Sequence, residues 1–334
     1  MVRWGLLGLG RAAQTFISAI KEVDDAKLIA VASLSNLDKF NFKNELRFKT
    51  YNNLINFKDI DAVYIATLNN KHANLIMKCA RADKAILCEK PMSISLSEAI
   101  NVHDYLEKNK ILFLENIAYR SHPQTKQIID LILNNEIGDI KKIQSSYGFH
   151  VNQLLKFKPN HRLFNKKFGG GAINDIGCYP VSLAILLIKL IKNEKNIDKY
   201  KIIKTKIDNN FRGTDDESYL KINFDNSFDA EFTISIKKKL INSTIIHGTK
   251  GKIIIDNPWL PENRELIKLY KNGKFYEIKI YSKLSLYANT ISEVSKSIKM
   301  NKKICDHPNM SLYESFMCSK ILFDWKNFDN NRSK

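Results

Sequence analysis

Apolar and polar positions follow two different periods along this chain. In its first third, short and nearly continuous apolar runs are separated by stretches with an apolar residue at every third or fourth position. Such runs are typical of parallel strands buried on both faces. Strands are therefore expected at residues 3–8, 27–33, 61–67, 84–88 and 111–116, and amphipathic helices at 11–23, 71–81 and 95–108. This alternation predicts a doubly wound parallel sheet.

After Tyr119 the apolar residues alternate strictly with polar ones, which is typical of antiparallel strands with one buried face. Such strands are expected at 140–150, 201–207, 219–224, 229–236, 242–247, 252–256, 266–270 and 275–280. Helices are expected at 123–134 and 310–325. The fold class is thus α/β, with a parallel-sheet domain at 1–119 and an α+β domain with a large, mostly antiparallel open sheet at 120–330.

Composition narrows the class of protein. The 334 residues are 44% hydrophobic, and no apolar run approaches the roughly 20 residues that cross a bilayer. Because a strand pattern begins at Val2, no cleavable leader is expected, and we expect a cytoplasmic protein. The net charge of +18 comes from dispersed lysines without a nucleic-acid-binding motif, so no nucleic-acid partner is expected. The five scattered cysteines and seven histidines form no metal-ligand spacing, so no metal is expected.

The segment GLGRAA at residues 8–13 follows the first strand and opens the first helix. Gly8, Gly10 and Ala13 fit G-x-G-x-x-A, in which the glycines allow a tight turn and close approach of a pyrophosphate, while Ala13 permits close packing. The N-terminal N–H groups of the helix then face the phosphates. The motif predicts that residues 1–119 bind a dinucleotide.

The end of the second strand bears on which dinucleotide is bound. An acidic residue there would accept hydrogen bonds from the ribose of NAD, but the chain reads Ser33-Leu34-Ser35-Asn36. The Ser33 and Ser35 hydroxyls, with Lys39 or Arg11 nearby, suit a 2′-phosphate. The sequence therefore predicts an NAD(P) cofactor and slightly favours NADP.

Two further segments carry reactive side chains. The strand KAILC ends on Glu89 and Lys90, and Pro91 stops strand pairing, so this charge pair is either a solvated loop or part of a site. In KKFGGGAINDIGCYPV (166–181), Asp175 and Tyr179 stand at i and i+4 and share a face if the segment is helical. Pro180 predicts a short helix followed by a longer one from near Val181. Taken alone, Asp175 could serve as a helix N-terminal carboxylate and Tyr179 as a core residue.

Four motifs in order give the chain a family resemblance. They are Gly8-x-Gly10-x-x-Ala13, Glu89-Lys90-Pro91, Tyr119-Arg120-x-His122-Pro123, and GGGAINDIGCYP at 169–180. Together they resemble the glucose–fructose oxidoreductase / inositol dehydrogenase (Gfo/Idh/MocA) family of NAD(P)-dependent oxidoreductases. The tyrosine four residues after the aspartate is similar to the subgroup with dimeric dihydrodiol dehydrogenases and xylose dehydrogenases.

The resemblance implies roles for these residues. Lys90 would be the active-site lysine, with Glu89 beside it and Pro91, often after a cis bond in relatives, directing the chain. Tyr179 would donate or accept the proton, and Asp175 would bind a substrate hydroxyl or orient neighbouring groups. Further residues would line the cofactor (Asn70, His72) or face the sugar (Arg120, His122, Arg162), although His122 could equally be an interior histidine.

The expected function is hydride transfer between the nicotinamide of NAD(P) and a carbinol or carbonyl carbon of a sugar, sugar derivative or cyclic polyol. Two alternatives stay open: a nucleotide-sugar ketoreductase or dehydrogenase of surface-glycan synthesis, and a non-catalytic dinucleotide-sensing regulator. A homodimer or homotetramer formed through the C-terminal sheet is expected, and neither a membrane nor a nucleic acid is expected as a partner. The substrate's identity stays open.

Overall fold

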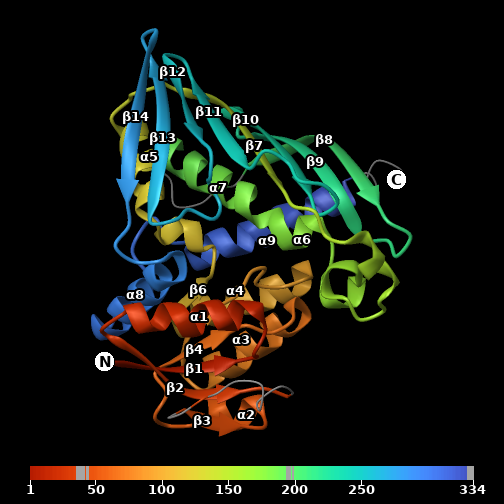
Figure 1. The fold of residues 1–334 in the computed structure, drawn as a ribbon, viewed down its shortest axis with the longest axis vertical. Coiled ribbons are helices and arrows are strands. Elements are labelled where there is room, and N and C mark those ends of the chain that lie inside the picture. The colour runs from red at the N-terminus through yellow and green to blue at the C-terminus, as the bar shows by residue number, and fades with distance from the viewer. Residues whose placement is uncertain (35–41, 43–44, 193–196, 198, 329–334) are drawn as a thin grey trace. The chain divides into compact units, whose positions relative to one another are not determined.

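The computed structural model describes residues 1–34, 42, 45–192, 197 and 199–328 (Figure 1). The chain divides into two compact units. Unit 1 comprises Met1–Ser121 and Lys283–Phe316, and unit 2 comprises His122–Ser282 and Met317–Lys334. The first change of unit, after residue 121, lies near the predicted boundary after residue 119. Residues 283–316, however, return to unit 1, which strand and helix periodicity did not indicate.

Unit 1 is built on a six-stranded sheet in the order β3-β2-β1-β4-β5-β6, with every pairing parallel. Its strands are β1 (Val2–Leu7), β2 (Ala26–Ala32), β3 (Leu46–Phe48), β4 (Ala62–Ile65), β5 (Ala85–Cys88) and β6 (Phe113–Glu115). Its α-helices are α1 (Arg11–Ala19), α2 (Tyr51–Ile55), α3 (His72–Arg81), α4 (Leu96–Asn109) and α8 (Leu286–Lys299). The predicted doubly wound parallel sheet is confirmed. The short edge strand β3 and helix α2 were not expected from the sequence.

Apolar side chains cover both faces of the parallel sheet. On one face the Phe16 ring stacks on Tyr64 with centroids 4.2 Å apart, and Trp4 meets Phe16 edge-on at 5.6 Å. Helix α8 packs against α1 on this unit, and Ser295 of α8 accepts a hydrogen bond from the Trp4 indole at 3.2 Å. At α4, the Ser95 hydroxyl caps the helix by accepting a hydrogen bond from the backbone N–H of Glu98.

Unit 2 contains an eight-stranded sheet in the order β14-β13-β12-β11-β7-β10-β9-β8, in which only the β7–β10 pairing is parallel. The strands are β7 (Ile140–Gly148), β8 (Tyr200–Asn209), β9 (Asp215–Phe224), β10 (Phe228–Ser235), β11 (Ser243–Gly248), β12 (Gly251–Ile255), β13 (Arg264–Lys271) and β14 (Lys274–Tyr281). This confirms the predicted large, mostly antiparallel sheet.

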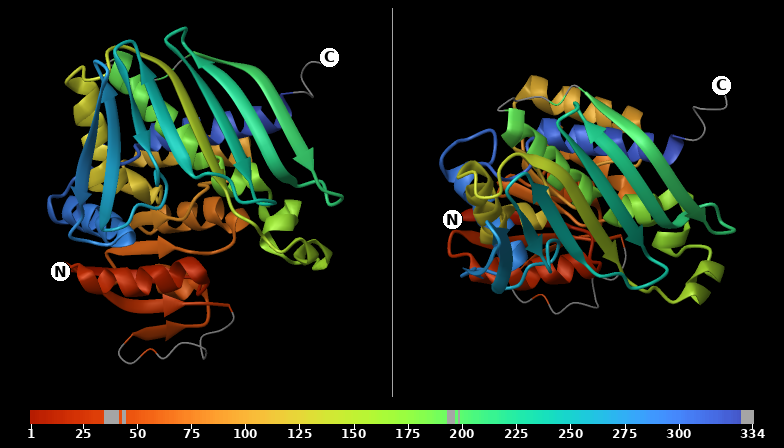
Figure 2. Two further views of the ribbon diagram at one scale, coloured as in Figure 1. Left: turned by 45° about the horizontal axis from the view of Figure 1, so that its top comes forward. Right: turned by 90° about the horizontal axis from the view of Figure 1, so that it is seen from above.

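Helices lie on one face of this sheet, and none of the described helices covers its other face (Figure 2). They are α5 (Pro123–Leu133), α6 (Ala172–Ile176), α7 (Cys178–Lys192) and the part of α9 (Leu312–Asn327) that belongs to unit 2. Burial follows the predicted alternation: Leu220, Ile222 and Phe224 of β9 are fully buried, and the residues between them are partly exposed.

The chain bends at Gly177 rather than at Pro180. Helix α7 begins at Cys178, not near Val181, because Pro180 falls in its first turn, where the missing N–H has no intrahelical partner to lose. Within the described ranges, no single helix is long and apolar enough to span a membrane. The helical segments Lys166–Ile176 and Cys178–Lys192, bent by 52°, meet that length and composition only as a pair.

Candidate active site

The dinucleotide-binding turn of unit 1 has the geometry that its glycines predict. Gly8 has φ +87°, and a Cβ there would lie 2.5 Å from the carbonyl oxygen of Ala66, so only glycine fits. Gly10 differs, because no described atom lies within 4 Å of the position that its Cβ would take. Ala13 is fully buried against the sheet. The turn therefore closes tightly at Gly8 and is open at Gly10.

Helix α1 begins at this turn without a side-chain cap. Its N-cap is Gly10, and its first turn contains no acidic residue. Unpaired N–H groups and the positive end of the helix dipole attract phosphate groups. Arg11 is exposed in the first turn, and Ser33 is buried at the end of β2. Ser35 and Lys39, the other residues predicted to contact the 2′-position, lie outside the described residues.

Asn70 and His72 lie in the segment after β4. The Oδ1 atom of Asn70 is buried without a hydrogen-bond partner among the described residues. His72 is fully buried, with Nδ1 2.8 Å from the Pro91 carbonyl oxygen and Nε2 3.2 Å from that of Thr67. Burial lowers the pKa of His72, and a neutral imidazole donates to only one of these oxygens. His72 thus links the chain segments that follow β4 and β5.

Glu89 is held by three donors at the carboxyl end of β5. Its Oε1 atom accepts from the Tyr64 hydroxyl at 2.6 Å, the Asn116 amide at 2.6 Å and the Tyr287 hydroxyl at 3.1 Å. The peptide bond between Lys90 and Pro91 is cis, as the family resemblance implied. Lys90, partly exposed, follows directly on this fixed carboxylate. Tyr287 lies in α8, so sequence reasoning could not link it to Glu89.

A second carboxyl group lies beneath the Lys90–Pro91 turn. Glu115 of β6 is 2% exposed, and its Oε1 accepts from the Met92 backbone N–H at 2.8 Å. Burial raises the pKa of Glu115 to about 7, although the Lys90 charge opposes this shift. Two acidic side chains, Glu89 and Glu115, therefore fix the backbone on either side of Lys90. The apolar run FLEN gave no sign of this role.

Arg120 and His122 are both buried. The Arg120 guanidinium forms an ion pair with Glu314 at 3.0 Å and donates from Nε to the Pro308 carbonyl at 2.6 Å, all within unit 1. His122 caps α5, because its Nδ1 accepts from the Gln124 backbone N–H, and burial lowers its pKa to about 4. These contacts hold the local fold. The predicted sugar contacts of both residues stay predictions.

In unit 2 the structure brings Asp175 and Arg162 together. The Nη1 atom of Arg162 donates to Oδ1 of Asp175 at 2.9 Å. Asp175 is 5% exposed and lies in α6, whereas the Arg162 side chain is 48% exposed on the preceding loop. The contact is a charge-assisted hydrogen bond, which fixes the orientation of the buried carboxylate.

Tyr179 lies in the first turn of α7 among aromatic neighbours. Its ring meets Tyr147 of β7 edge-on at 5.5 Å between centroids, and Trp259 lies at 6.2 Å. These ring contacts orient the phenol through packing. Tyr147 and Trp259 are far from Tyr179 in sequence, and only the sheet brings them together.

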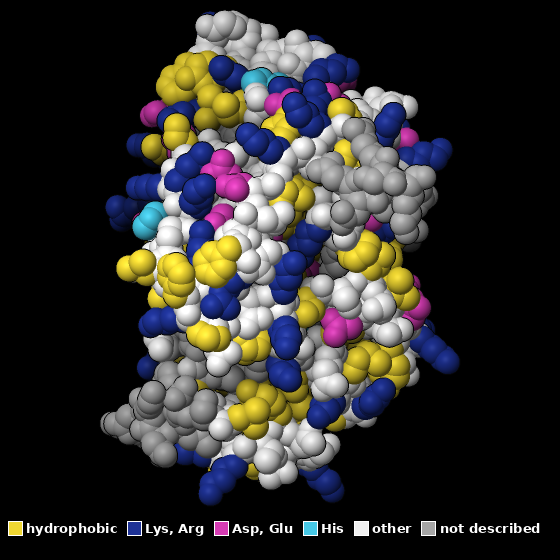
Figure 3. Space-filling model, turned by 90° about the vertical axis from the view of Figure 1, so that its right-hand side faces the viewer, with side chains coloured by type: hydrophobic (Ala, Val, Ile, Leu, Met, Phe, Trp, Pro, Cys, Tyr) yellow, Lys and Arg dark blue, Asp and Glu magenta, His cyan; other side chains and the backbone are white. Residues whose placement is uncertain are grey.

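The residues of unit 1 fit a bound dinucleotide. The space at Gly10, the uncapped N-terminus of α1 and the unpartnered Oδ1 of Asn70 suit a pyrophosphate and a polar group beside it. Among the described residues, no group of His, Cys, Asp and Glu side chains is arranged to hold a metal ion. Lysine and arginine side chains are spread over the face in Figure 3, mixed with apolar and acidic ones.

Comparison with known proteins identifies the class. Residues 2–116 match the oxidoreductase family with an NAD-binding Rossmann fold, and residues 125–254 match the GFO/IDH/MocA C-terminal domain. The chain belongs to the Gfo/Idh/MocA oxidoreductase family, which confirms the resemblance drawn from its motifs.

Individual relatives agree over nearly the whole chain. The trans-1,2-dihydrobenzene-1,2-diol dehydrogenase of Mus musculus is 25% identical over 333 residues, which covers 96% of this chain and 95% of the relative. The fold is similar to that of KijD10, a 3-ketoreductase from Actinomadura kijaniata in complex with NADP and TDP-benzene (TM-score 0.82, 19% identity, 97% and 96% covered). It is also similar to an aldose–aldose oxidoreductase from Caulobacter crescentus complexed with glycerol (TM-score 0.82, 18% identity, 98% of each chain covered).

Proposed function

We propose that this protein is an NAD(P)-dependent oxidoreductase of a sugar, a sugar derivative or a cyclic polyol, and that Lys90, Asp175 and Tyr179 carry its chemistry. The bound nicotinamide supplies or accepts the hydride. The observation that carries the proposal is that both units match one oxidoreductase family. The chain also contains Lys90, Asp175 and Tyr179. A regulator that only senses a dinucleotide would need Gly8 and Gly10 but not a proton donor.

Lys90 and Tyr179 are proposed to manage the proton and the charge at the reacting carbon. In the reductive direction, Tyr179 gives its proton to the developing alkoxide, and the Lys90 ammonium stabilises the negative charge. An unperturbed tyrosine, with a pKa of about 10, is protonated at neutral pH and is ready to donate. In the oxidative direction the phenol must ionise near neutrality, which requires about 4 kcal/mol. An ammonium at about 4 Å supplies an interaction of that size at an effective dielectric near 20.

Asp175 is proposed to bind a substrate hydroxyl next to the reacting carbon. The contact with Arg162 supports this, because it fixes the orientation of the Asp175 carboxylate. Dihydrodiols and sugars, on which the named relatives act, both carry a hydroxyl next to the carbinol carbon. A substrate with vicinal oxygens would therefore be preferred over a simple alcohol or ketone.

A nucleotide-sugar substrate is favoured by the charge of the loop that carries Arg162. Lys158, Arg162, Lys166 and Lys167 are all exposed on this loop, and no acidic residue lies between them. A cluster of cations concentrates anionic ligands near it. The similarity in fold to a 3-ketoreductase solved with TDP-benzene is consistent with this second candidate.

We also propose that the cofactor is NADP and not NAD. The sequence after β2 supplies the Ser33 and Ser35 hydroxyls and no carboxylate at the position that would bind the ribose of NAD.

We further propose that the protein is cytoplasmic and forms a homodimer or homotetramer through the face of the eight-stranded sheet that none of the described helices covers. On β13, Leu266 and Tyr270 are partly exposed on the face opposite the buried Ile267 and Leu269, which supports an apolar contact there. Sedimentation velocity of the purified protein tests the assembly, and a purely monomeric protein would contradict it.

The function is tested by following the oxidation of NADPH and NADH with a panel of carbonyl substrates. The panel contains keto-sugars, aldoses, dicarbonyls and nucleotide-linked keto-sugars, each at several concentrations. Turnover with a substrate that has vicinal oxygens supports the proposal. Tight binding of NADPH without turnover across the panel would instead favour the dinucleotide-sensing regulator.

A further inference from the structure

Two consecutive buried carboxylates begin strand β9. Asp215 is 6% exposed and Asp216 is 3% exposed, and successive residues of a strand point to opposite sides. Buried carboxylates are retained only where donors or opposite charges satisfy them. One donor to Asp215 is Ile173 of the helix that carries Asp175, and one donor to Asp216 is Lys156 on the segment that leads to Arg162.

Asp215 holds helix α6. Its Oδ2 atom accepts from the backbone N–H of Ile173 at 2.7 Å and from the Ser218 hydroxyl at 3.2 Å. Its Oδ1 atom lies only 2.1 Å from the position that a Cβ on Gly171 would take, and Gly171 has φ +106°. The glycine before α6 is therefore required so that Asp215 can reach the first turn of the helix.

Lys326, near the end of α9, holds the same helix from a second element. Its ammonium donates to Oδ1 of Asn174, and its charge faces Asp215. Burial lowers the pKa of Lys326 to about 8, and attraction to Asp215 opposes that shift. In turn, burial raises the pKa of Asp215, and Lys326 opposes this most strongly. Two mutually compensating charges thus lie next to the helix that carries Asp175.

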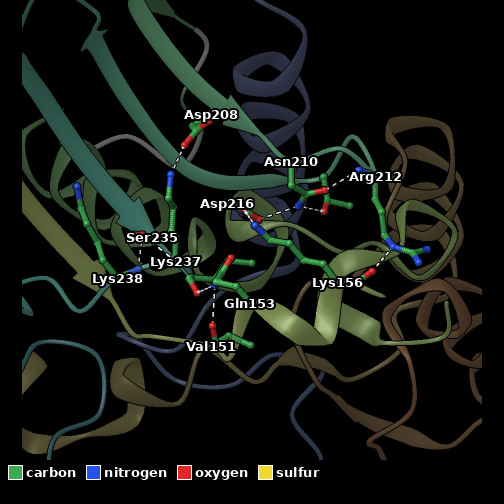
Figure 4. Close-up of polar contacts among 12 residues, drawn as sticks. Val151, Gln153, Lys156, Asp208, Asn210, Arg212, Asp216, Ser235, Lys237 and Lys238 are labelled. Carbon is green, nitrogen blue, oxygen red and sulfur yellow. Dashed lines mark hydrogen bonds and ion pairs between the residues drawn. The ribbon is translucent and has the colours of Figure 1, made fainter. Parts of the chain in front are cut away.

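Asp216 holds the loop that carries Arg162 (Figure 4). It accepts from the Lys156 ammonium and from the Asn210 amide, the latter at 2.7 Å. Lys156 lies in the 3₁₀ helix Gln153–Phe157, and its carbonyl oxygen also accepts from Arg212 Nε. Six residues further along the loop, Arg162 reaches Asp175. The contacts therefore form a closed circuit. Asp215 binds α6, Asp175 of α6 binds Arg162, and the segment that carries Arg162 is bound through Lys156 to Asp216, the neighbour of Asp215.

We propose that Asp215, Asp216 and Lys326 are positioning residues that hold α6 and the 153–165 loop so that Asp175 and Tyr179 keep the orientation that catalysis needs. The inference rests on the proposed function, since it assumes that Asp175 and Tyr179 serve the reaction. Tyr179 follows α6 closely, because the Gly177 N–H bonds back to the Ile173 carbonyl at 3.0 Å and joins α6 to α7. A displacement of α6 therefore reaches both residues.

The variant Lys326→Met removes the ammonium and keeps the length of the side chain. Its matched control is Lys320→Met on the same helix, which removes contacts with Tyr200 and Asp324 and none with α6. The proposal predicts that kcat falls about 10- to 100-fold in Lys326→Met, as small misplacements of reacting groups do. Cofactor affinity stays unchanged, the control keeps its kcat, and Lys326→Arg, which can still donate to Asn174, recovers most of the rate.

Hydrogen exchange of residues 169–181 is measured on the same variants and needs no substrate. Faster exchange of this segment in Lys326→Met but not in Lys320→Met supports the anchoring, even if the proposed function itself fails for lack of turnover. If Lys326→Met does not fold, Asp215→Asn carries the same test, because it removes the charge and keeps an acceptor for Ile173. Unchanged exchange, an equal change in the control, or a rise in KM at constant kcat would overturn the proposal.

Discussion

Arg162 and Asp175, thirteen residues apart on a loop and a helix of unit 2, lie in hydrogen-bonded contact at 2.9 Å. The Asp175 carboxylate is almost inaccessible, while about half of the Arg162 side chain reaches solvent. The pair therefore has one fixed member and one exposed member. The exposed Arg162 side chain can therefore be replaced to test substrate binding, while the buried Asp175 stays in place.

Replacing Arg162 with alanine should weaken substrate binding and leave the fold intact. Because removal of the guanidinium leaves the buried Asp175 carboxylate without this donor, the free energy of unfolding should fall by about 1–3 kcal/mol. KM should rise by about tenfold, which corresponds to about 1.4 kcal/mol of lost orientation at Asp175. Steady-state kinetics and urea denaturation measure the two effects. An unchanged KM would remove Arg162 from the substrate site.

The two glycines of the nucleotide turn should respond oppositely to alanine. Gly8→Ala places a Cβ 2.5 Å from the Ala66 carbonyl at positive φ, so the protein should lose stability. Gly10→Ala meets no described atom within 4 Å, so Tm should not change while NADPH affinity falls at least about tenfold. Thermal unfolding and fluorescence titration test this contrast. Normal NADPH binding by Gly10→Ala would place the pyrophosphate elsewhere.

The Arg120–Glu314 pair should act on stability. Both side chains are almost fully buried, and removal of one partner leaves an uncompensated charge. Arg120→Met and Glu314→Gln should each lower the free energy of unfolding by about 3–5 kcal/mol, whereas the double variant should recover part of the loss. Urea denaturation measures all three. A fully stable Arg120→Met enzyme with a raised KM would instead support the predicted sugar contact of Arg120.

Glu115 should make stability depend on pH. Its pKa is raised from 4.5 to about 7 in the folded protein, so the native state binds more protons between these values. Its contribution to stability is therefore fully present below pH 4.5 and is lost as the pH rises through 7, by up to about 3 kcal/mol. Glu115→Gln should unfold at higher denaturant concentration than the wild type at pH 8 and at a similar one at pH 4.5. The exposed Glu277→Gln serves as control, and identical pH profiles for wild type and Glu115→Gln would contradict this account.

The order of apolar and polar residues predicted those elements in which it agrees with the side chains that are buried. The parallel strands β1, β2, β4, β5 and β6 and the alternating strands β9 and β10 appear as expected, because each is specified by residues close in sequence. Strand β3 has only three residues and lacks a clear apolar run, and α8 mixes its apolar positions with serines and a threonine. Both depend on packing within unit 1 more than on their own pattern.

In the candidate site, too, some features were predicted from the sequence and others depend on contacts between distant residues. Gly8 and Gly10 follow from a motif, whereas the cis peptide before Pro91 and the choice of Lys90, Asp175 and Tyr179 as candidates were implied by the family resemblance. The partners of these residues do not follow from motifs. Tyr287 reaches Glu89 across 198 residues, and Lys326 reaches Asn174 across 152. Contacts over such separations depend on the topology of each unit, which local periodicity does not encode.

The central claim is that Tyr179 and Lys90 serve the chemical step and not cofactor binding. The most direct test measures reduction of the best panel substrate by NADPH under single-turnover conditions in wild type, Tyr179→Phe and Lys90→Met, alongside NADPH titration. The account predicts that both variants bind NADPH as the wild type does and lose at least about a hundredfold in the rate of hydride transfer. Near-wild-type hydride transfer in either variant would contradict the account.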